Sequence, residues 1–157
     1  NEYVVLLALA LGGIALIVFE YFMRGRSASL DRIESVSRPR ALAIGFFQSL
    51  AMIPGVSRAA ATIVGGLSIG FTRTAAVEFS FLLAIPTMLA ATALDLVRSP
   101  LRFTGHEYGL LAVGCIGAFL TARLTIGLFL RFIERHTFTG FGVYRIVLAV
   151  VFCISRT

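Results

Sequence analysis

Two side chains in the middle of this chain could bind an anion, although their surroundings are apolar. Ser57 and Arg58 directly follow Pro54-Gly55 within the segment SLAMIPGVSRAAATIVGGL, residues 49–67. Serine is a preferred N-cap, so it can begin a helix whose first amides have no intrahelical partner. The positive end of such a helix and the guanidinium of Arg58, whose donor fork matches phosphate oxygens, would together form an anion site.

The neighbouring residues fit the same chemistry. Gly55 permits an unusual backbone conformation and the close approach of a ligand, and the amides after it, from Val56 onwards, are donors. Thr62 shares a helical face with Arg58 and adds a hydroxyl, so a phosphate or diphosphate fits this cluster. The plainer interpretation is a capping serine beside an arginine that extends to the membrane surface. An arginine deep in an apolar segment is costly unless it has a function, which favours the phosphate site.

The composition places these residues in a membrane protein. Of the 157 residues, 58% are hydrophobic and 14% are charged, and the mean hydropathy is +0.92. A net charge of +6 on an apolar chain favours anionic headgroups or phosphate over nucleic acid as partners. We therefore predict an all-α, polytopic integral membrane protein with a single membrane domain over residues 1–157. Its apolar segments are Tyr3–Met23, Thr74–Val97, Gly109–Leu130 and Gly142–Ser155.

Two short apolar segments would position the candidate anion site. Residues 41–53 and 58–70 are each about 20 Å long as helices, which is too short to cross a bilayer alone. Joined at Pro54-Gly55, they predict a re-entrant hairpin over residues 41–70 with its tip near mid-membrane. Irregular backbone at that depth lines a protein-walled or water-filled cavity, and broken helices of this kind mark binding sites. The alternative is one kinked membrane span whose turn serves packing only.

The charged loops predict the orientation of the chain. Arg24–Arg40 holds five arginines, so the positive-inside rule places it in the cytoplasm. Arg131–Gly140 should share that side, and Arg98–Tyr108 should lie outside. Pro86 predicts a kink in its membrane span because proline removes a backbone hydrogen bond.

Other polar residues in the chain have less specific interpretations. Glu20 and Arg123 lie close enough to the ends of apolar segments to reach the membrane surface, which favours structural roles. His106 and His136 lie in polar loops, where a histidine is typically solvated, and we assign them no catalytic role. Two cysteines in apolar runs are expected to be small buried side chains: Cys115 and Cys153.

Residues 44–86, IGFFQSLAMIPGVSRAAATIVGGLSIGFTRTAAVEFSFLLAIP, carry a resemblance to a known family. They resemble the second signature region of the undecaprenyl-diphosphate phosphatase, or bacitracin-resistance, family, whose motif is PGxSRSGxT followed by a run ending in EFSFLLAIP. The flanking segments fit the C-terminal half of that family in order and length. The resemblance implies a multi-pass enzyme of the bacterial inner membrane, built from two inverted repeats that each contain a re-entrant helix pair. It would hydrolyse undecaprenyl diphosphate to undecaprenyl phosphate and phosphate, recycling the lipid carrier for cell-wall synthesis.

The resemblance also implies roles for single residues. Ser57 and Arg58 would be catalytic, and Glu78 would support the site by orienting Arg58 or by helping to hold a metal. Substrate contacts are expected from Gly55, Val56, Thr62 and Gln48. A divalent cation, Mg²⁺ or Ca²⁺, would bridge phosphate oxygens and carboxylates that mostly lie outside this chain, so this chain itself supplies no assigned metal ligand.

The chain departs from the family pattern in two ways. Ala59 and Ala60 stand where the family has serine and glycine. Ala59 lacks a phosphate donor, and Ala60 costs about 1 kcal/mol or more if that position needs a positive φ. The family's first signature, with paired glutamates and a Pro-Val-Ser-Ser-Thr-Gly-His run, has no match here.

The missing signature leads to further expectations. We expect that the family's N-terminal half is absent from this chain and acts as its partner. Without that half, we expect the 157 residues to be inactive. A prenyl diphosphate lipid is the expected ligand, and a homodimer is left open. Two other functions are also left open: half of a lipid-phosphate transporter or flippase, which also uses broken helices, and a non-catalytic binder of prenyl diphosphate.

Overall fold

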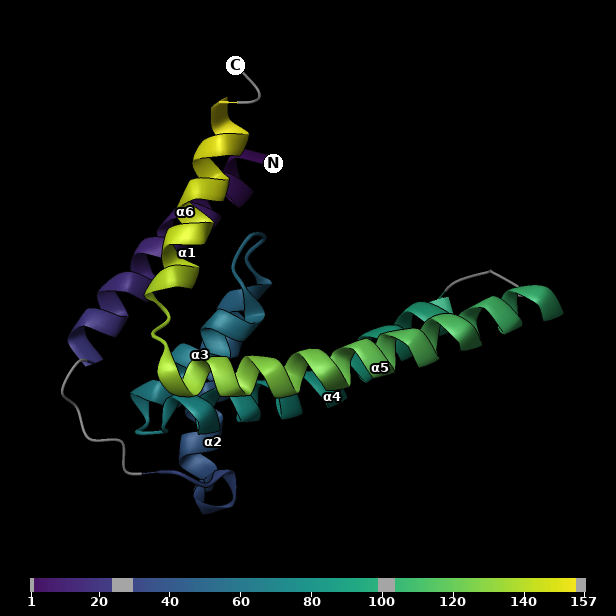
Figure 1. Ribbon diagram of the computed structural model, residues 1–157, viewed down its shortest axis with the longest axis horizontal. Coiled ribbons are helices and arrows are strands. Elements are labelled where there is room, and N and C mark those ends of the chain that lie inside the picture. The colour runs from purple at the N-terminus through teal and green to yellow at the C-terminus, as the bar shows by residue number, and fades with distance from the viewer. Residues whose placement is uncertain (1, 24–29, 99–103, 155–157) are drawn as a thin grey trace.

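The computed structural model describes residues 2–23, 30–98 and 104–154 as a set of helices (Figure 1). Three of them, α1, α4 and α5, are long and apolar enough to cross a membrane, and α6 is a shorter apolar helix. The predicted all-α class is therefore confirmed. The elements are α1 (Glu2–Met23), the 3-10 turn η1 (Ile33–Ser35), α2 (Arg38–Ser49), the 3-10 turn η2 (Leu50–Met52), α3 (Arg58–Ser68), α4 (Arg73–Arg98), α5 (Gly105–Arg135) and α6 (Thr139–Ile154).

Two helices extend further than the apolar segments indicated. α2 begins at Arg38 rather than at residue 41, because Ser37 is extended and a proline occupies the first turn, where its missing N–H costs nothing. α5 continues to Arg135, so the loop expected over Arg131–Gly140 shrinks to three residues before α6. The expected loop was too long because the arginines that suggested it occupy the last turns of α5, where cations interact favourably with the helix dipole.

The start of α5 is fixed by a capping box at Thr104. The Thr104 hydroxyl oxygen accepts from the Glu107 amide at 3.5 Å, and the Glu107 carboxylate accepts from the Thr104 amide at 2.6 Å. Both bonds satisfy amides at a helix start. The predicted outer loop, Arg98–Tyr108, is thus partly helical; residues 99–103 of it lie outside the described part of the chain.

α2 and α3 form a helical hairpin, because the chain turns back at Pro54-Gly55. Gly65 of α3 lies so close to α2 that a Cβ atom there would meet the Phe47 Cβ at 2.9 Å. α3 also packs on α4, where a Cβ on Gly66 would meet the Ala76 Cβ at 3.1 Å. Residues 41–70 are therefore not a straight rod, as the hairpin prediction requires. The depth of the turn in the bilayer stays a prediction.

The core lies where the hairpin meets α4 and the C-terminal end of α5. Its most deeply buried large side chains are Phe71, Ile44, Ile133 and Val77. The segment before α2 joins this core through Leu30, whose amide donates to the Gly70 carbonyl at 3.1 Å and whose carbonyl accepts from the Thr72 amide at 3.1 Å. Burial against α3 and α4 thus fixes both ends of the hairpin.

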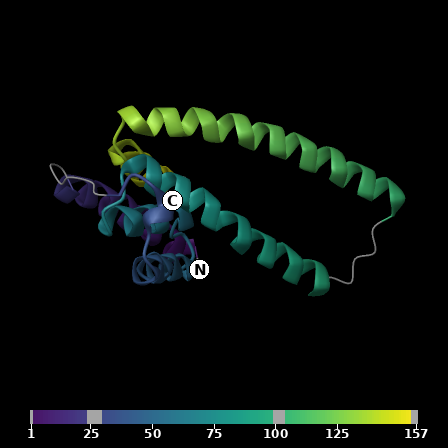
Figure 2. The same cartoon turned by 90° about the horizontal axis from the view of Figure 1, so that it is seen from below.

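The long helices form two pairs with different directions. α1 packs along α6, and this pair runs crosswise to α4 and α5, which extend together from the core (Figure 1). Away from the core α4 and α5 diverge (Figure 2). α4 remains helical through Pro86. Because the two pairs run in different directions, they do not define one common direction across a membrane. The predicted sides of the charged loops therefore stay a prediction.

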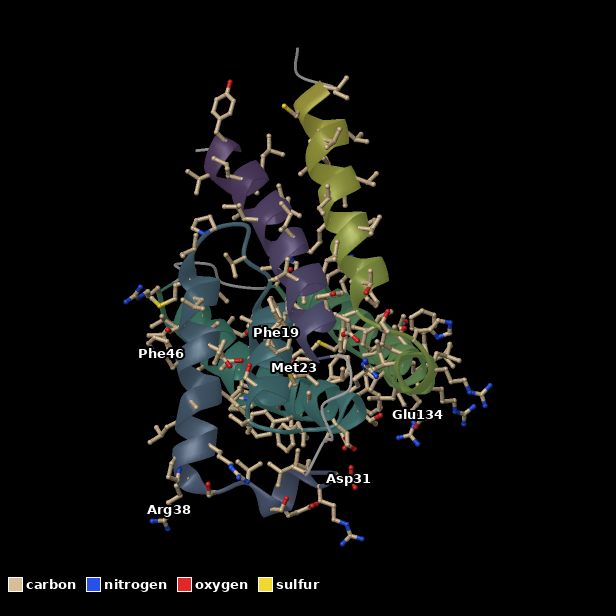
Figure 3. The ribbon with its side chains drawn as sticks, turned by 90° about the vertical axis from the view of Figure 1, so that its left-hand side faces the viewer. Phe19, Met23, Asp31, Arg38, Phe46 and Glu134 are labelled. Carbon is tan, nitrogen blue, oxygen red and sulfur yellow. The ribbon has the colours of Figure 1, made fainter. Side chains whose placement is uncertain are left out.

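Exposed apolar side chains cover the long helices, as expected for surfaces that face lipid. Phe46 on α2 projects outward, and polar Arg38 and Asp31 lie at the end of the molecule opposite the termini (Figure 3). Cys115 and Cys153 are both exposed. The expectation that they are buried was wrong, because in a membrane protein apolar surroundings in the sequence do not distinguish lipid-facing from core positions.

Candidate functional site

The turn between α2 and α3 is tightly constrained by its own backbone and by α1. The Ile53 amide donates to the Leu50 carbonyl at 3.2 Å, and the Val56 amide donates to the Ile53 carbonyl at 3.1 Å. Gly55 has φ +93°, and a Cβ there would lie 2.7 Å from the Val5 carbonyl oxygen of α1. The glycine is therefore required by both its backbone conformation and its close approach to a helix.

These contacts bear on two expectations about the turn. The close approach seen at Gly55 is to α1, and its contact with a substrate stays a prediction. The Val56 amide is used inside the turn, so in this conformation it is not a free donor for a diphosphate. A turn of this kind satisfies its buried amides locally, which leaves the anion site to the start of α3.

The start of α3 has the predicted cap. Ser57 is extended, with φ −72° and ψ 121°, and its Oγ accepts a hydrogen bond from the Ala60 amide at 3.2 Å. Helix geometry leaves the amides of Arg58 and Ala59 without carbonyl partners inside α3. Ala60 is helical, so alanine at this position carries no strain of the kind a positive φ would impose. Two amides without a partner inside α3 and the positive helix end therefore meet at one point.

Arg58 is half-buried and is oriented by α4. Its Nη1 donates to the Thr87 Oγ1 at 3.0 Å, and Thr87 is anchored in turn to the Leu83 carbonyl at 2.9 Å. A guanidinium has five N–H donors, so one such bond leaves others for a ligand. The sequence reasoning missed Thr87; its signal was a hydroxyl directly after the mid-helix Pro86.

The start of α3 lies between two cavities. Arg58 and Ala59 line the larger one, about 810 Å³, whose other walls are mostly apolar and small side chains of α4 and α5, including Phe81, Ala118 and Ala122. The smaller cavity, about 240 Å³, is lined by Ser57 and by aromatic residues near α6. A charged group at the edge of an apolar groove suits a molecule with an anionic head and an apolar tail.

Arg145 of α6 also reaches the turn, and sequence reasoning missed it. Its Nη2 donates to the Gly55 carbonyl at 3.0 Å, and the residue lines the smaller cavity beside Ser57. The signal was available, because an arginine within the apolar segment Gly142–Ser155 is a functional candidate by default.

Three of the predicted site residues lie outside this constellation. Thr62 is 2% exposed, and its hydroxyl pairs with the Ser80 Oγ of α4 at 2.6 Å, so it joins two helices; its role in substrate binding stays a prediction. Gln48 is half-buried on α2, and its Oε1 is buried without a partner among the described residues. Glu78 is exposed on α4 beside buried Val77, and its role in supporting Arg58 or a metal stays a prediction.

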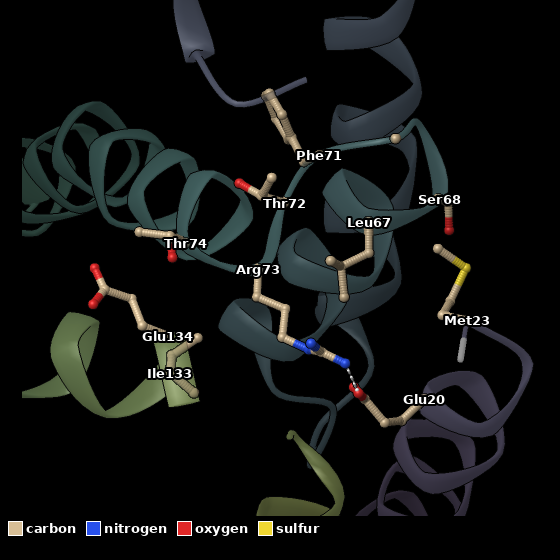
Figure 4. A pocket seen from close by; sticks show the side chains of 11 residues that line it. Glu20, Met23, Leu67, Ser68, Phe71, Thr72, Arg73, Thr74, Ile133 and Glu134 are labelled. Atoms are coloured by element: carbon tan, nitrogen blue, oxygen red, sulfur yellow. Dashed lines mark hydrogen bonds and ion pairs between the residues drawn. The ribbon is translucent and has the colours of Figure 1, made fainter. Parts of the chain in front are cut away.

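A third cavity, with a more polar lining, lies at the opposite end of α3 and has a volume of about 390 Å³ (Figure 4). There the guanidinium of Arg73, at the start of α4, forms an ion pair with the Glu20 carboxylate of α1. Glu20 is 2% exposed, so it is held by a buried ion pair and does not extend to the surface as expected. Glu134 lies on the opposite wall of this cavity (Figure 4).

The remaining polar candidates lie at the surface. Arg123 is exposed on α5, and His106 is exposed in its first turn. His136 is exposed directly after α5, where its ring stacks on Phe132 at 4.0 Å. Among the described residues, no three histidine, cysteine, aspartate or glutamate side chains come together as a metal site.

The fold and the site define a class: a helical membrane protein whose broken hairpin presents a capped helix start and an arginine to an apolar groove. Residues 1–151 match the family described as Bacitracin resistance protein BacA, and the chain belongs to that family.

Curated relatives with the name undecaprenyl-diphosphatase cover nearly the whole chain. The protein from Wolinella succinogenes is 47% identical over 145 residues, which are 92% of this chain and 57% of that protein. The proteins from Sulfurihydrogenibium sp. and Campylobacter jejuni are 43% and 46% identical, each over 97% of this chain and over 60% and 57% of their own lengths. The chain thus spans about three fifths of the length of these relatives.

Proposed function

We propose that this chain forms the diphosphate-binding part of an undecaprenyl-diphosphate phosphatase in the bacterial inner membrane. The single observation that carries the proposal is the start of α3, where the Ser57 cap, two amides without a carbonyl partner inside α3 and Arg58 meet beside an apolar groove. The shared name of the curated relatives supports the choice of undecaprenyl diphosphate as substrate. The reaction would release phosphate and leave undecaprenyl phosphate in the membrane.

The residues of this chain would bind and orient the substrate. The Arg58 guanidinium, held by Thr87, would bind oxygens of the diphosphate, and the amides of Arg58 and Ala59 would add two further donors. These groups are fixed before substrate arrives, so they can stabilise charge that builds on the phosphate oxygens during attack by water. The groove between α4 and α5 would hold part of the prenyl tail.

The residues around Arg58 do not fit a divalent cation on their own. Magnesium and calcium prefer several oxygen ligands, carboxylates above all. The residues that line the larger cavity include no aspartate or glutamate. Any Mg²⁺ or Ca²⁺ bound beside Arg58 would need carboxylates other than those of the residues that line this cavity. That the 157 residues alone are inactive stays an expectation.

A chimera tests the proposed activity most directly. This chain would replace the matching 145-residue segment of the Wolinella succinogenes relative, and phosphate release from undecaprenyl diphosphate would be measured in detergent. We expect release by the chimera, and a loss of at least about a hundredfold when Arg58 is changed to methionine, since a charge-assisted contact to phosphate is lost. Arg123→Met, on the exposed face of α5, is the matched control.

The other outcomes distinguish the alternatives. Binding of prenyl diphosphate without phosphate release would favour a non-catalytic binder, for which Ala59 and the missing carboxylates are the supporting observations. Movement of the lipid across a vesicle membrane without hydrolysis would favour a transporter. Either result, in a chimera that inserts and folds, would contradict the proposed reaction.

A further inference from the structure

We propose that Arg145 is a positioning residue that fixes the turn before the Ser57–Arg58 site, and that Gly12 creates the space it needs. The inference rests on the proposed function for its catalytic consequence. Its structural part, the fixing of the turn, stands on the contacts alone. Nothing in the pattern of the hairpin itself reveals it, because Arg145 lies 90 residues after Gly55.

The contacts of Arg145 join three elements. Its Nη2 donates to the Gly55 carbonyl at 3.0 Å and, more weakly, to the Ala8 carbonyl of α1 at 3.4 Å. Gly55 itself lies against α1, so one guanidinium holds α6, α1 and the turn together. A charged donor on a carbonyl makes a stronger bond than a neutral one. The carbonyl of Gly55 therefore has a fixed direction two residues before the cap of α3.

Gly12 allows the guanidinium to pass across α1. A Cβ on Gly12 would lie 2.7 Å from the Arg145 Nη2 and 3.3 Å from its Cζ. The neighbouring Gly13 and Gly142 bring α1 and α6 close together, since a Cβ on Gly13 would meet the Gly142 carbonyl oxygen at 2.6 Å. Any side chain at position 12 would thus displace the end of Arg145 while leaving the backbone of α1 intact.

Arg145 also borders the site directly. Its Nε is buried without a partner among the described residues, and the side chain lines the 240 Å³ cavity together with Ser57. The carbonyl that Arg145 binds belongs to Gly55, the left-handed residue of the turn. A guanidinium that only filled space would not need this hydrogen bond. These independent observations favour a positioning role at the start of α3.

A spin label in the turn tests the structural part. The chain, with Cys115 and Cys153 changed to alanine, would carry a nitroxide at Met52, which is 84% exposed and directly precedes the turn. In proteoliposomes we expect Arg145→Met to increase the mobility of the label and Arg145→Lys to restore most of the order. Unchanged mobility in Arg145→Met would overturn the proposal.

A substitution of Gly12 provides a second test of the structural part, in which Arg145 itself is unchanged. Gly12→Ala should increase the mobility of the label at Met52 as Arg145→Met does, although alanine favours a helix over glycine. The matched control is Gly114→Ala in α5, where an added Cβ meets nothing within 4 Å. If Arg145→Met fails to insert into the membrane, Gly12→Ala decides the question, and unchanged mobility in it would contradict the proposal.

Activity in the chimera tests the catalytic consequence. For Arg145→Met and Gly12→Ala we expect kcat to fall about tenfold to a hundredfold with KM changed less than about threefold, because the donors are misplaced rather than removed. Arg145→Lys should recover part of kcat. If the unaltered chimera releases no phosphate, the proposed function fails, and the label mobility still decides whether Arg145 fixes the turn. Normal kcat together with a mobile turn would overturn the positioning role.

Discussion

The Glu20–Arg73 ion pair can be broken by substituting either residue, and the two substitutions should lower the free energy of unfolding by different amounts. The Glu20 side chain is 3% exposed and the Arg73 side chain is 42% exposed. Arg73→Met leaves a buried carboxylate without its partner, which costs roughly 3–5 kcal/mol in comparable buried pairs. Glu20→Gln leaves a guanidinium that can turn to water, so solvent screening reduces its cost to about 1 kcal/mol or less. The double variant should recover most of the loss of Arg73→Met.

Unfolding in mixed detergent micelles, followed by the helical circular dichroism signal, measures the four proteins of this cycle. We expect a coupling free energy of about 3–4 kcal/mol between the two positions, at the upper end of the values for residues in direct contact. Arg123→Met is the control for loss of an exposed arginine and should change stability little. Equal losses of unfolding free energy for Glu20→Gln and Arg73→Met, or losses that simply add in the double variant, would contradict a buried ion pair between the two residues.

Three more changes test other parts of the structure. Thr62→Val should cost about 1–2 kcal/mol by leaving the buried Ser80 hydroxyl unpaired, and adding Ser80→Ala should recover most of it; unfolding midpoints that do not recover would contradict the pairing. Gly55→Ala should cost more than about 2 kcal/mol because of its φ of +93°, whereas Gly114→Ala should be neutral in the same unfolding assay. Ala59→Ser, at an exposed position lining both cavities, should lower the KM of the chimera about threefold to tenfold, and an unchanged KM would show that this side chain does not face the diphosphate.

Local chemistry made part of the site predictable. Ser57 caps α3 because a serine side chain can accept a hydrogen bond from a free amide in the first turn of a helix. Gly55 takes the left-handed conformation that a tight turn requires. The fold class followed from composition, since long apolar segments leave helices as the solution that satisfies every backbone group in lipid. These features depend on neighbours within a few residues.

The rest depended on contacts between distant segments. Thr87 orients Arg58 across 29 residues, and Arg145 reaches Gly55 across 90. Glu78 is exposed although it directly follows buried Val77, because one position along a helix turns a side chain by about 100°. The spacing of residues in the sequence shows which side chains share a face of a helix. Only the packing of the helices decides which of those faces contacts a neighbouring helix.

In the proposed function, Arg58 at the start of α3 binds the diphosphate of a prenyl lipid. Its most direct test is the affinity of the detergent-solubilised chain for farnesyl diphosphate, compared between the unaltered protein, Arg58→Met and the control Arg123→Met. We expect the Kd to rise about tenfold to a hundredfold in Arg58→Met and to stay unchanged in the control. An equal affinity in all three proteins would contradict it.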